Sequence, residues 1–383
     1  MLDDKIKRKT EEEEKTHSKE ITRQLSIENP DRKTRRYSGE GIEQKSELRF
    51  ENLQLTIEKV QDCKKEGFIG DGFTVVGMKN PRSFFIETQT LGHILVEDGV
   101  QLYSEKIYGD DFFMDIIYCP TVNCYFLAHP DGLQRKDIDD KPPYLFMHMK
   151  FGWSSMSCFI YSKVNQSLLA IKESLNLLVI NPRLKKIELE LKNPVGDMIK
   201  EFRLFGEKDN RVVSLTWEGH VILYSLTHGK KRGVVDFYSI GRIEERLEFG
   251  ISIAAKNDYV LVEMKGLYNS AHVCSRMIAF KLNGDTLIKK SCIDQYNQKI
   301  GEKMALEHCG STGSHILWVG LSNDNEKGLA QLYDYDTEGE VLQELEDKRV
   351  YHQERLPQRL IIQSGKFYYV GWFGKLMRLS LNN

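Results

Sequence analysis

The sequence predicts an all-β fold in which seven repeated units of short antiparallel strands close into a ring. Three observations carry this prediction. From Leu48 onward, short apolar or alternating runs are interrupted by Gly, Asn, Asp and Pro, which is typical of many short strands. One strand motif recurs at a nearly constant spacing. No sustained helical period follows the first 47 residues, which disfavours a helical repeat.

The recurring motif is a short apolar strand, which we term strand b and use to align the units. It begins at seven positions: Ser83, Cys124, Ser167, Arg211, Tyr259, His315 and Lys366. The intervals between successive positions are 41, 43, 44, 48, 56 and 51 residues. A period of this length is typical of a β-propeller, in which each repeat forms one blade.

The other strands of each unit can be placed around strand b. An apolar run precedes each strand b, as FTVVGM precedes Ser83, and is suited to be the inner strand a. Six units continue through a strand c and a hairpin into a strand d, with turn residues such as Glu-Asp-Gly at 97–99 and Asn-Gly-Asp at 283–285. The sequence therefore predicts blades of four antiparallel strands.

The seventh unit ends before a strand d. We expect residues 48–60, LRFENLQLTIEKV, to supply it, because this stretch alternates apolar and polar residues and has no other partner. Pairing the first strand with the last unit closes the ring and removes exposed sheet edges. The predicted organisation is a charged tail over residues 1–47 and a seven-bladed β-propeller over residues 48–383.

The tail contains 12 Lys plus Arg and 12 Asp plus Glu within residues 1–47, with a single aromatic residue. So few apolar residues cannot offset the entropy of an ordered chain, so we expect disorder. Ser38 and Ser26 each follow an arginine three residues earlier, a pattern typical of basophilic kinase substrates. We expect phosphorylation at Ser38 and Ser26; the alternative is a solvated tail of mixed charge.

Composition bounds the class of protein. The chain has 54 Lys plus Arg and 56 Asp plus Glu, so its net charge of -2 gives no general attraction to nucleic acid or to an acidic membrane. Its 7 cysteines have no CxxC spacing, which favours a reduced, intracellular chain. No apolar run approaches the roughly 18 residues that span a bilayer. We therefore expect a cytoplasmic protein.

In its period and strand rhythm, the chain over residues 48–383 resembles the WD-repeat-like propeller family. No unit carries the family's Gly-His pair before strand a together with Trp-Asp at the end of strand c, and Tyr333-Asp334 and Tyr335-Asp336 come nearest to that pattern. The resemblance implies a platform that binds other proteins, which also suits exposed loops on a rigid scaffold. We expect a non-enzymatic protein-interaction scaffold within a larger assembly, without cofactor or small-molecule substrate.

Charges in the turns between strands c and d are unevenly distributed around the predicted ring. These turns share one face. Blades 1, 2 and 6 contribute mostly acidic residues: Glu97, Asp98, Asp137, Asp139, Asp140, Asp336 and Glu338. Blades 3 and 4 contribute basic ones: Arg183, Lys185, Lys186, Lys230, Lys231 and Arg232. We expect these six residues to bind an acidic peptide or a phosphate-bearing partner; the alternative is that they are ordinary solvated turn residues.

The opposite face receives the turns between strands b and c. Two of these are expected to be long loops, over residues 265–276 in blade 5 and 320–327 in blade 6. Insertions in neighbouring blades are typical of a second binding surface. The alternative is neutral lengthening, because surface loops grow at little cost in free energy.

The alternative function is a metal-dependent propeller hydrolase with calcium in the central channel. Such a site needs carboxylate and amide oxygens on the inner strands. The inner runs contain the isolated acids Asp115, Glu201, Glu248 and Glu307 with no matched Asn. We therefore assign no catalytic or metal-binding residue from the sequence.

Overall fold

A computed structural model describes the strands and most turns of the compact unit Leu53–Asn383. The described residues are 54–62, 74–88, 92–106, 113–152, 158–206, 208–226, 233–239, 248–268, 272–296, 303–324, 327–352, 361–363, 366–370 and 375–382. The predicted tail over residues 1–47, with Ser26 and Ser38, lies outside them. The described part of the chain contains no helix that is long and apolar enough to cross a membrane.

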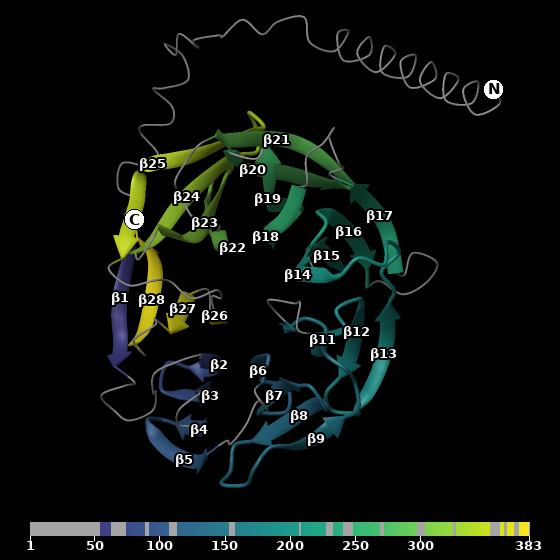
Figure 1. The fold of residues 1–383 in the computed structure, drawn as a ribbon, viewed down its shortest axis with the longest axis vertical. Coiled ribbons are helices and arrows are strands. Elements are labelled where there is room, and N and C mark those ends of the chain that lie inside the picture. The colour runs from purple at the N-terminus through teal and green to yellow at the C-terminus, as the bar shows by residue number, and fades with distance from the viewer. Residues whose placement is uncertain are drawn as a thin grey trace, which may run out of the picture. The chain divides into compact units, whose positions relative to one another are not determined.

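The described residues form seven antiparallel sheets of four strands each, arranged as blades around a central axis (Figure 1). Six blades use four consecutive strands, which run in order from the axis to the rim. Blade 1 contains β2 (Thr74–Asn80), β3 (Ser83–Thr88), β4 (Gly92–Glu97) and β5 (Val100–Glu105). Blade 2 contains β6 (Asp115–Cys119), β7 (Cys124–His129), β8 (Gly132–Asp137) and β9 (Tyr144–Met147). Blade 3 contains β10 (Phe159–Ser162), β11 (Ser167–Lys172), β12 (Asn176–Asn181) and β13 (Lys186–Leu191).

Blades 4 to 6 follow the same order. Blade 4 contains β14 (Ile199–Phe205), β15 (Arg211–Thr216), β16 (His220–Ser225) and β17 (Gly233–Ser239). Blade 5 contains β18 (Glu248–Lys256), β19 (Tyr259–Tyr268), β20 (His272–Asn283) and β21 (Thr286–Tyr296). Blade 6 contains β22 (Lys303–Thr312), β23 (His315–Asp324), β24 (Lys327–Asp336) and β25 (Val341–His352). The prediction of an all-β propeller with four-stranded blades is confirmed, and every strand b begins where the repeat placed it.

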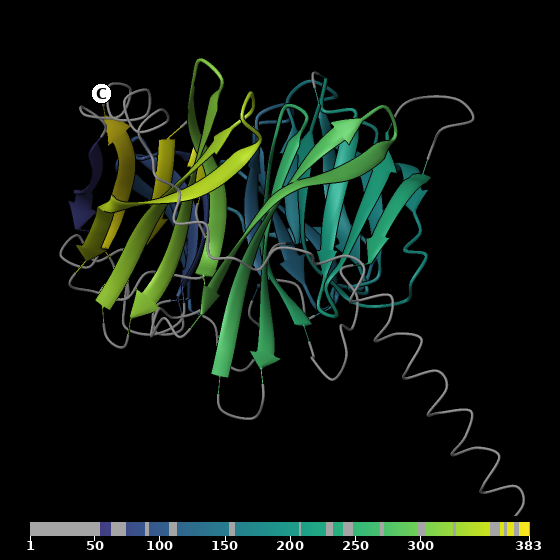
Figure 2. The same ribbon diagram turned by 90° about the horizontal axis from the view of Figure 1, so that it is seen from above.

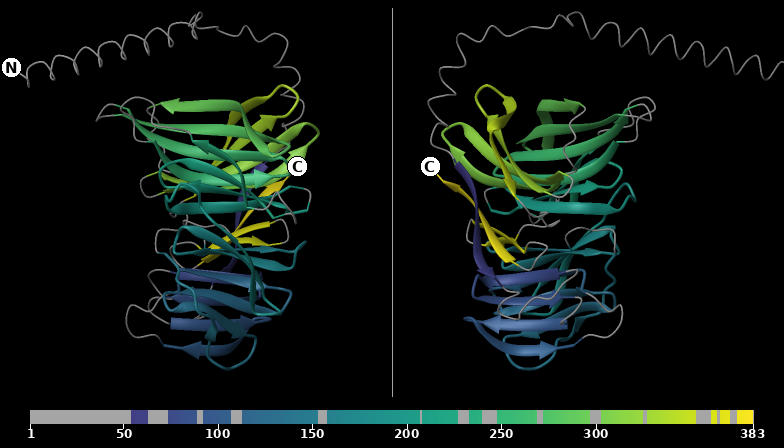
Figure 3. Two further views of the ribbon diagram at one scale, coloured as in Figure 1. Left: turned by 90° about the vertical axis from the view of Figure 1, so that its right-hand side faces the viewer. Right: turned by 60° about the vertical axis from the view of Figure 1, so that its left-hand side comes forward.

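The seventh blade joins the two ends of the propeller. It contains β26 (Ile361–Gln363), β27 (Lys366–Val370), β28 (Lys375–Asn382) and β1 (Gln54–Asp62). β1 pairs antiparallel with β28, from Gln54 opposite Asn382 to Asp62 opposite Lys375. Figure 3 shows the purple β1 beside the yellow β28. The predicted closure by an N-terminal strand is confirmed; the described strand runs over 54–62, and residues 48–53 of the predicted stretch lie outside the described residues.

A register irregularity between strands c and d recurs in all seven described blades. In the six continuous blades the pairing shifts at these strand c positions: Leu95/Val96, Leu133/Gln134, Val179/Ile180, Leu223/Tyr224, Ala279/Phe280 and Ala330/Leu332. In blade 7 the shift falls between Lys59 and Gln61 of β1. Such irregularities bend and twist a strand locally. β1 therefore occupies the strand d position in geometry as well as in order.

The hydrophobic core lies between neighbouring blades. Every side chain of β3 and β7 is buried, whereas β5 at the rim is mostly exposed. One core cluster joins Phe85 and Leu95 of blade 1 to Tyr125 and Leu127 of blade 2. Adjacent blades cover both faces of each strand b, which therefore reads as a nearly continuous apolar run. This burial made strand b the clearest repeat in the sequence.

The long loops predicted on blades 5 and 6 are wrong. In blade 5, β19 continues to Tyr268 and β20 begins at His272, with residues paired up to those positions. In blade 6, β23 continues to Asp324 and β24 begins at Lys327. The polar and glycine residues that suggested loops instead extend the hairpins, since backbone pairing does not require an apolar sequence. Figure 2 shows the green strands of blade 5 reaching further along the axis than the teal strands beside them.

Candidate partner-binding face

The turns between strands a and b and between strands c and d lie together on one face, which we call the turn face. In four blades a backbone N–H at the end of strand c donates to the carbonyl oxygen just before strand b. These bonds are Gly99 to Arg82 (2.8 Å), Leu226 to Asn210 (2.9 Å), Leu282 to Asp258 (2.6 Å) and Thr337 to Ser314 (2.9 Å). The two turns of each of these blades therefore support each other.

Neighbouring blades are also bonded across the turn face. Asn165 Nδ2 of blade 3 donates to the Asp209 carbonyl oxygen of blade 4 at 3.1 Å. The Gly206 N–H of blade 4 donates to the Asn257 carbonyl oxygen of blade 5 at 2.8 Å. Arg211 Nη2 lies 2.6 Å from Asp285 Oδ1 of blade 5. These bonds hold the turns of blades 3 to 5 in fixed relative positions, which suits a docking surface.

Half of the predicted basic site lies on the described turn face. Arg183 and Lys185 lie in the turn between β12 and β13, and Lys186 begins β13; all three are exposed. Lys230, Lys231 and Arg232 lie outside the described residues. Among the residues that the structure describes, no carboxylate lies within ion-pair distance of Arg183, Lys185 or Lys186. Within the described part of the chain, these three cations are exposed to solvent.

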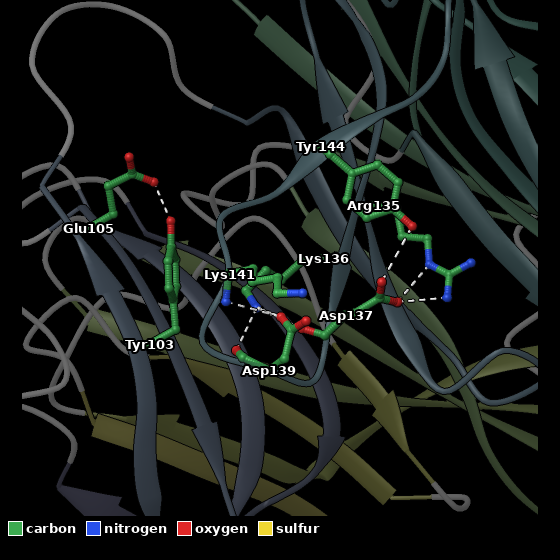
Figure 4. A network of polar contacts seen from close by, with 8 residues as sticks. All are labelled: Tyr103, Glu105, Arg135, Lys136, Asp137, Asp139, Lys141 and Tyr144. Carbon is green, nitrogen blue, oxygen red and sulfur yellow. Dashed lines mark hydrogen bonds and ion pairs between the residues drawn. The ribbon is translucent and has the colours of Figure 1, made fainter.

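Several predicted acidic residues already have cationic neighbours. Glu97 of blade 1 forms an ion pair with Lys79. Asp137 of blade 2 lies 2.6 Å from Arg135 Nη2, and the Tyr144 hydroxyl also donates to it (Figure 4). These pairs partly neutralise the acidic residues of blades 1 and 2.

Buried Lys136 of β8 stabilises the acidic turn that follows β8 in blade 2. Its side chain is fully buried, and its Nζ donates to the carbonyl oxygens of Asp137 (2.7 Å) and Asp139 (2.8 Å) and to Asp139 Oδ1 (3.1 Å). The ammonium also lies 4.8 Å from the centre of the Tyr103 ring of blade 1. Burial lowers the pKa of Lys136, while its bonds to Asp139 oppose that shift. Lys136 therefore stabilises both the turn and the contact between blades 1 and 2.

The inner strands hold a buried cluster of charges that sequence analysis did not assemble. Arg203 of β14 lies 2.8 Å from Glu201 Oε1 on the same strand and 2.7 Å from Glu307 Oε1 of β22. Glu201 Oε2 also accepts hydrogen bonds from Ser252 Oγ and the Ile253 N–H of β18, each at 2.9 Å. One guanidinium and one carboxylate thereby tie together the inner strands of blades 4, 5 and 6.

Two of the four inner acids singled out in the sequence thus share one arginine. Arg203 binds both Glu201 and Glu307, so these carboxylates are engaged with a fixed cation. Asp115 accepts the N–H groups of Cys158 (2.7 Å) and Phe159 (3.0 Å) of the next blade. Glu307 and Asp115 thus each bind a group of another blade. The sequence signal for Arg203 was its position two residues after Glu201, which places both side chains on the same face of a strand.

Glu307 should make the stability of the propeller depend on pH. Burial raises the pKa of Glu307 to about 7 from an ordinary value of 4.5, although Arg203 opposes the shift. A carboxyl group with a higher pKa in the folded state than in the unfolded state favours folding while it is protonated. This stabilisation is complete below the pKa of the unfolded state and is lost as pH rises through the pKa of the folded state. We expect the wild-type chain to lose about 2 kcal/mol of unfolding free energy relative to Glu307→Gln between pH 5 and pH 8.

Urea unfolding of the full chain at several pH values measures this difference. Glu218→Gln, which removes an exposed carboxyl, is the matched control and should change little with pH. A constant difference between wild type and Glu307→Gln from pH 5 to pH 8 would show that Glu307 stays ionised.

A second cluster of polar side chains lies at the end of blade 4 opposite the turn face, at the turn between β15 and β16. Asp197 Oδ2 accepts the Glu218 N–H at 2.9 Å and lies 3.6 Å from His220 Nδ1. The ligand atoms of Asp197, Glu218 and His220 lie within 4.8 Å of one another, a donor set that could hold a divalent cation. The hydrogen bonds of Asp197 and Thr216 fix the turn between β15 and β16, because Asp197 accepts the Glu218 N–H and Thr216 Oγ1 accepts the His220 N–H.

Comparison with known proteins identifies the architecture. No protein-family model matches the chain, and no curated protein matches its sequence. A solved structure described as BBS1N in complex with ARL6DN, soaked with mercury, is similar with a TM-score of 0.50 and 11% identity, over 82% of this chain and 97% of that one. The β-propeller domain of Cps50 (Swd1) from Myceliophteria thermophila matches with a TM-score of 0.44 and 13% identity, over 63% of this chain and 77% of that domain. The chain has the architecture of a WD-repeat-like β-propeller.

Proposed function

We propose that this chain is a non-catalytic protein-interaction scaffold, a subunit of a larger intracellular assembly that binds an acidic partner through the turn face of blades 3 and 4. The observation that carries the proposal is the exposed basic group of Arg183, Lys185 and Lys186, which has no ion pair among the described residues and lies on a face braced by hydrogen bonds. A rigid surface loses little conformational entropy on binding. BBS1N, which shares the fold, was crystallised in a complex with ARL6DN, as its description states.

The proposal extends to residues outside the described part of the chain. Lys230, Lys231 and Arg232, which follow β16 of the adjacent blade in the sequence, are proposed to belong to the same basic site. The tail over residues 1–47 is proposed as a flexible segment regulated by phosphorylation at Ser38 and Ser26, with the propeller over residues 48–383. A cytoplasmic location suits the cysteine usage of the sequence. Mass spectrometry of the purified chain detects those phosphoserines directly.

Affinity purification of the tagged full chain, with quantitative mass spectrometry, tests the scaffold function. We expect stoichiometric protein partners for the wild type and their loss from a chain carrying Arg183→Glu, Lys185→Glu and Lys186→Glu, because reversed charges repel an acidic partner. The matched control reverses Lys150, Lys192 and Lys289, which are exposed away from the blade 3 turn. A wild-type chain that is purified alone would remove the main support for a scaffold.

A further inference from the structure

Two of the most exposed large apolar side chains in the described residues lie on the turn face of blade 3. Leu184 is 69% exposed and Val164 is 58% exposed. Leu184 lies in the turn between β12 and β13, and Val164 lies in the turn between β10 and β11. Both turns belong to the same blade and the same face. Together with Arg183, Lys185 and Lys186, the site combines apolar and basic side chains.

Leu184 is held in its exposed position by the backbone around it. Asn181 Oδ1 accepts the N–H groups of Arg183 and Leu184, each at 3.1 Å. Asn181 Nδ2 in turn donates to Glu188 Oε1 at 2.9 Å, which fixes the amide itself. Lys185 has a positive φ of 52° and places its ammonium 5.4 Å from the centre of the Phe146 ring of blade 2. The turn is thus ordered before any partner arrives, which reduces the entropic cost of binding.

The neighbouring turn that carries Val164 is fixed in the same way. The Asn165 N–H donates to Ser162 Oγ at 3.0 Å, and that hydroxyl donates to Asp209 Oδ2 of blade 4 at 3.0 Å. Lys163, next to Val164, is exposed and has no ion pair within the described part of the chain. Leu184 therefore lies between two cations in the sequence, and Val164 lies next to one.

The backbone of the Leu184 turn disfavours a phosphate group as the main ligand. Turns that bind phosphate use consecutive free N–H groups as a concave anion site. Here Pro182 has no N–H, and the next two N–H groups, of Arg183 and Leu184, are both used by Asn181. These two N–H groups are therefore not available to an anion, and a phosphate would leave Leu184 and Val164 in water. A carboxylate beside an apolar side chain would satisfy both kinds of group.

We propose that the blade 3 turn pair binds an acidic peptide segment that also carries a large apolar side chain. Leu184 and Val164 supply the apolar contacts, while Arg183, Lys186 and Lys163 pair with the acidic side chains. The inference rests on the proposed scaffold function and names the chemistry of its partner. Lys185, which lies over Phe146, mainly holds the turn in position.

Selection of random twelve-residue peptides displayed on phage against the full chain tests the inference. We expect the enriched sequences to combine Asp or Glu with Leu, Ile, Phe or Trp. The best peptide, synthesised with a fluorophore, should bind Leu184→Ala and Arg183→Ala each about tenfold more weakly than wild type in fluorescence anisotropy. Val341→Ala is the matched control, because Val341 is 52% exposed in blade 6 and should leave binding unchanged.

The outcomes separate this inference from the scaffold function. Enrichment of peptides lacking acidic or apolar residues, no enrichment, or unchanged binding to Leu184→Ala overturns it. Tighter binding of a phosphoserine peptide without apolar residues would instead make the site a phosphate reader. If protein partners are still purified with the full chain in those cases, the scaffold function stands and only the peptide chemistry fails.

Discussion

Deletion of residues 1–62 is expected to abolish cooperative unfolding of the propeller, because it removes β1 and opens the ring at blade 7. β1 pairs with β28 at eight positions, from Gln54 to Asp62. Without it, β28 becomes an unpaired edge strand whose backbone groups lose their partners. Met377 and Leu379 of β28 also pack on blade 6, so disorder would spread to that interface.

Circular dichroism during heating measures the effect, and the matched control is a deletion of residues 1–47, which leaves β1 intact. We expect the shorter deletion to unfold in a sharp transition near that of the full chain. The longer deletion should unfold over a broad range at much lower temperature, or aggregate. Two deletions with the same sharp transition would show that β1 contributes little to closure of the ring.

Substitution of Arg203 by Met is expected to cost about 3 to 5 kcal/mol of unfolding free energy at pH 8. The change keeps much of the side-chain volume but leaves Glu201 and Glu307 buried without their shared cation. An uncompensated buried charge is far more costly than the loss of an exposed ion pair. The inner strands of blades 4 and 6 would then repel each other.

Urea unfolding of Arg203→Met at pH 8 and pH 5 measures this cost. The defect should be smaller at pH 5, because Glu307 is then protonated and carries no charge to compensate. Adding Glu307→Gln should recover part of the stability at pH 8 for the same reason. The exposed substitution Arg183→Met is the control and should change stability little. An Arg203→Met chain as stable as wild type would contradict the assigned role of the cluster.

The sequence predicted most reliably those strands that are buried on both faces. Strand b of blade 2, for example, starts at Cys124 as predicted, because every residue from Cys124 to His129 is buried and the apolar run ends with the strand. Strand ends in solvent were harder to predict. The blade 5 hairpin continues past Gly266, where backbone pairing rather than apolar side chains holds the strands together.

The candidate site was predictable only in part. The exposed turn position of Arg183 followed from the repeat, since a turn residue between two identified strands is placed by counting. The exposure of Leu184 could not be predicted from the repeat, because an isolated leucine between two cations is equally compatible with a side chain buried under the turn. Arg203 could be placed on an inner strand, but its contact with Glu307 joins blades 4 and 6, and a linear repeat does not reveal how far side chains reach across the axis.

Hydrogen–deuterium exchange of the full chain, alone and bound to the partner purified with it, tests the central claim most directly. The claim is that the partner binds the turn face of blades 3 and 4. Binding should slow exchange in residues 163–166, 182–187 and 227–232, and leave 217–220 at the opposite end of blade 4 unchanged. Protection confined to 217–220, or to the rim of another blade, would contradict the assignment of the binding face.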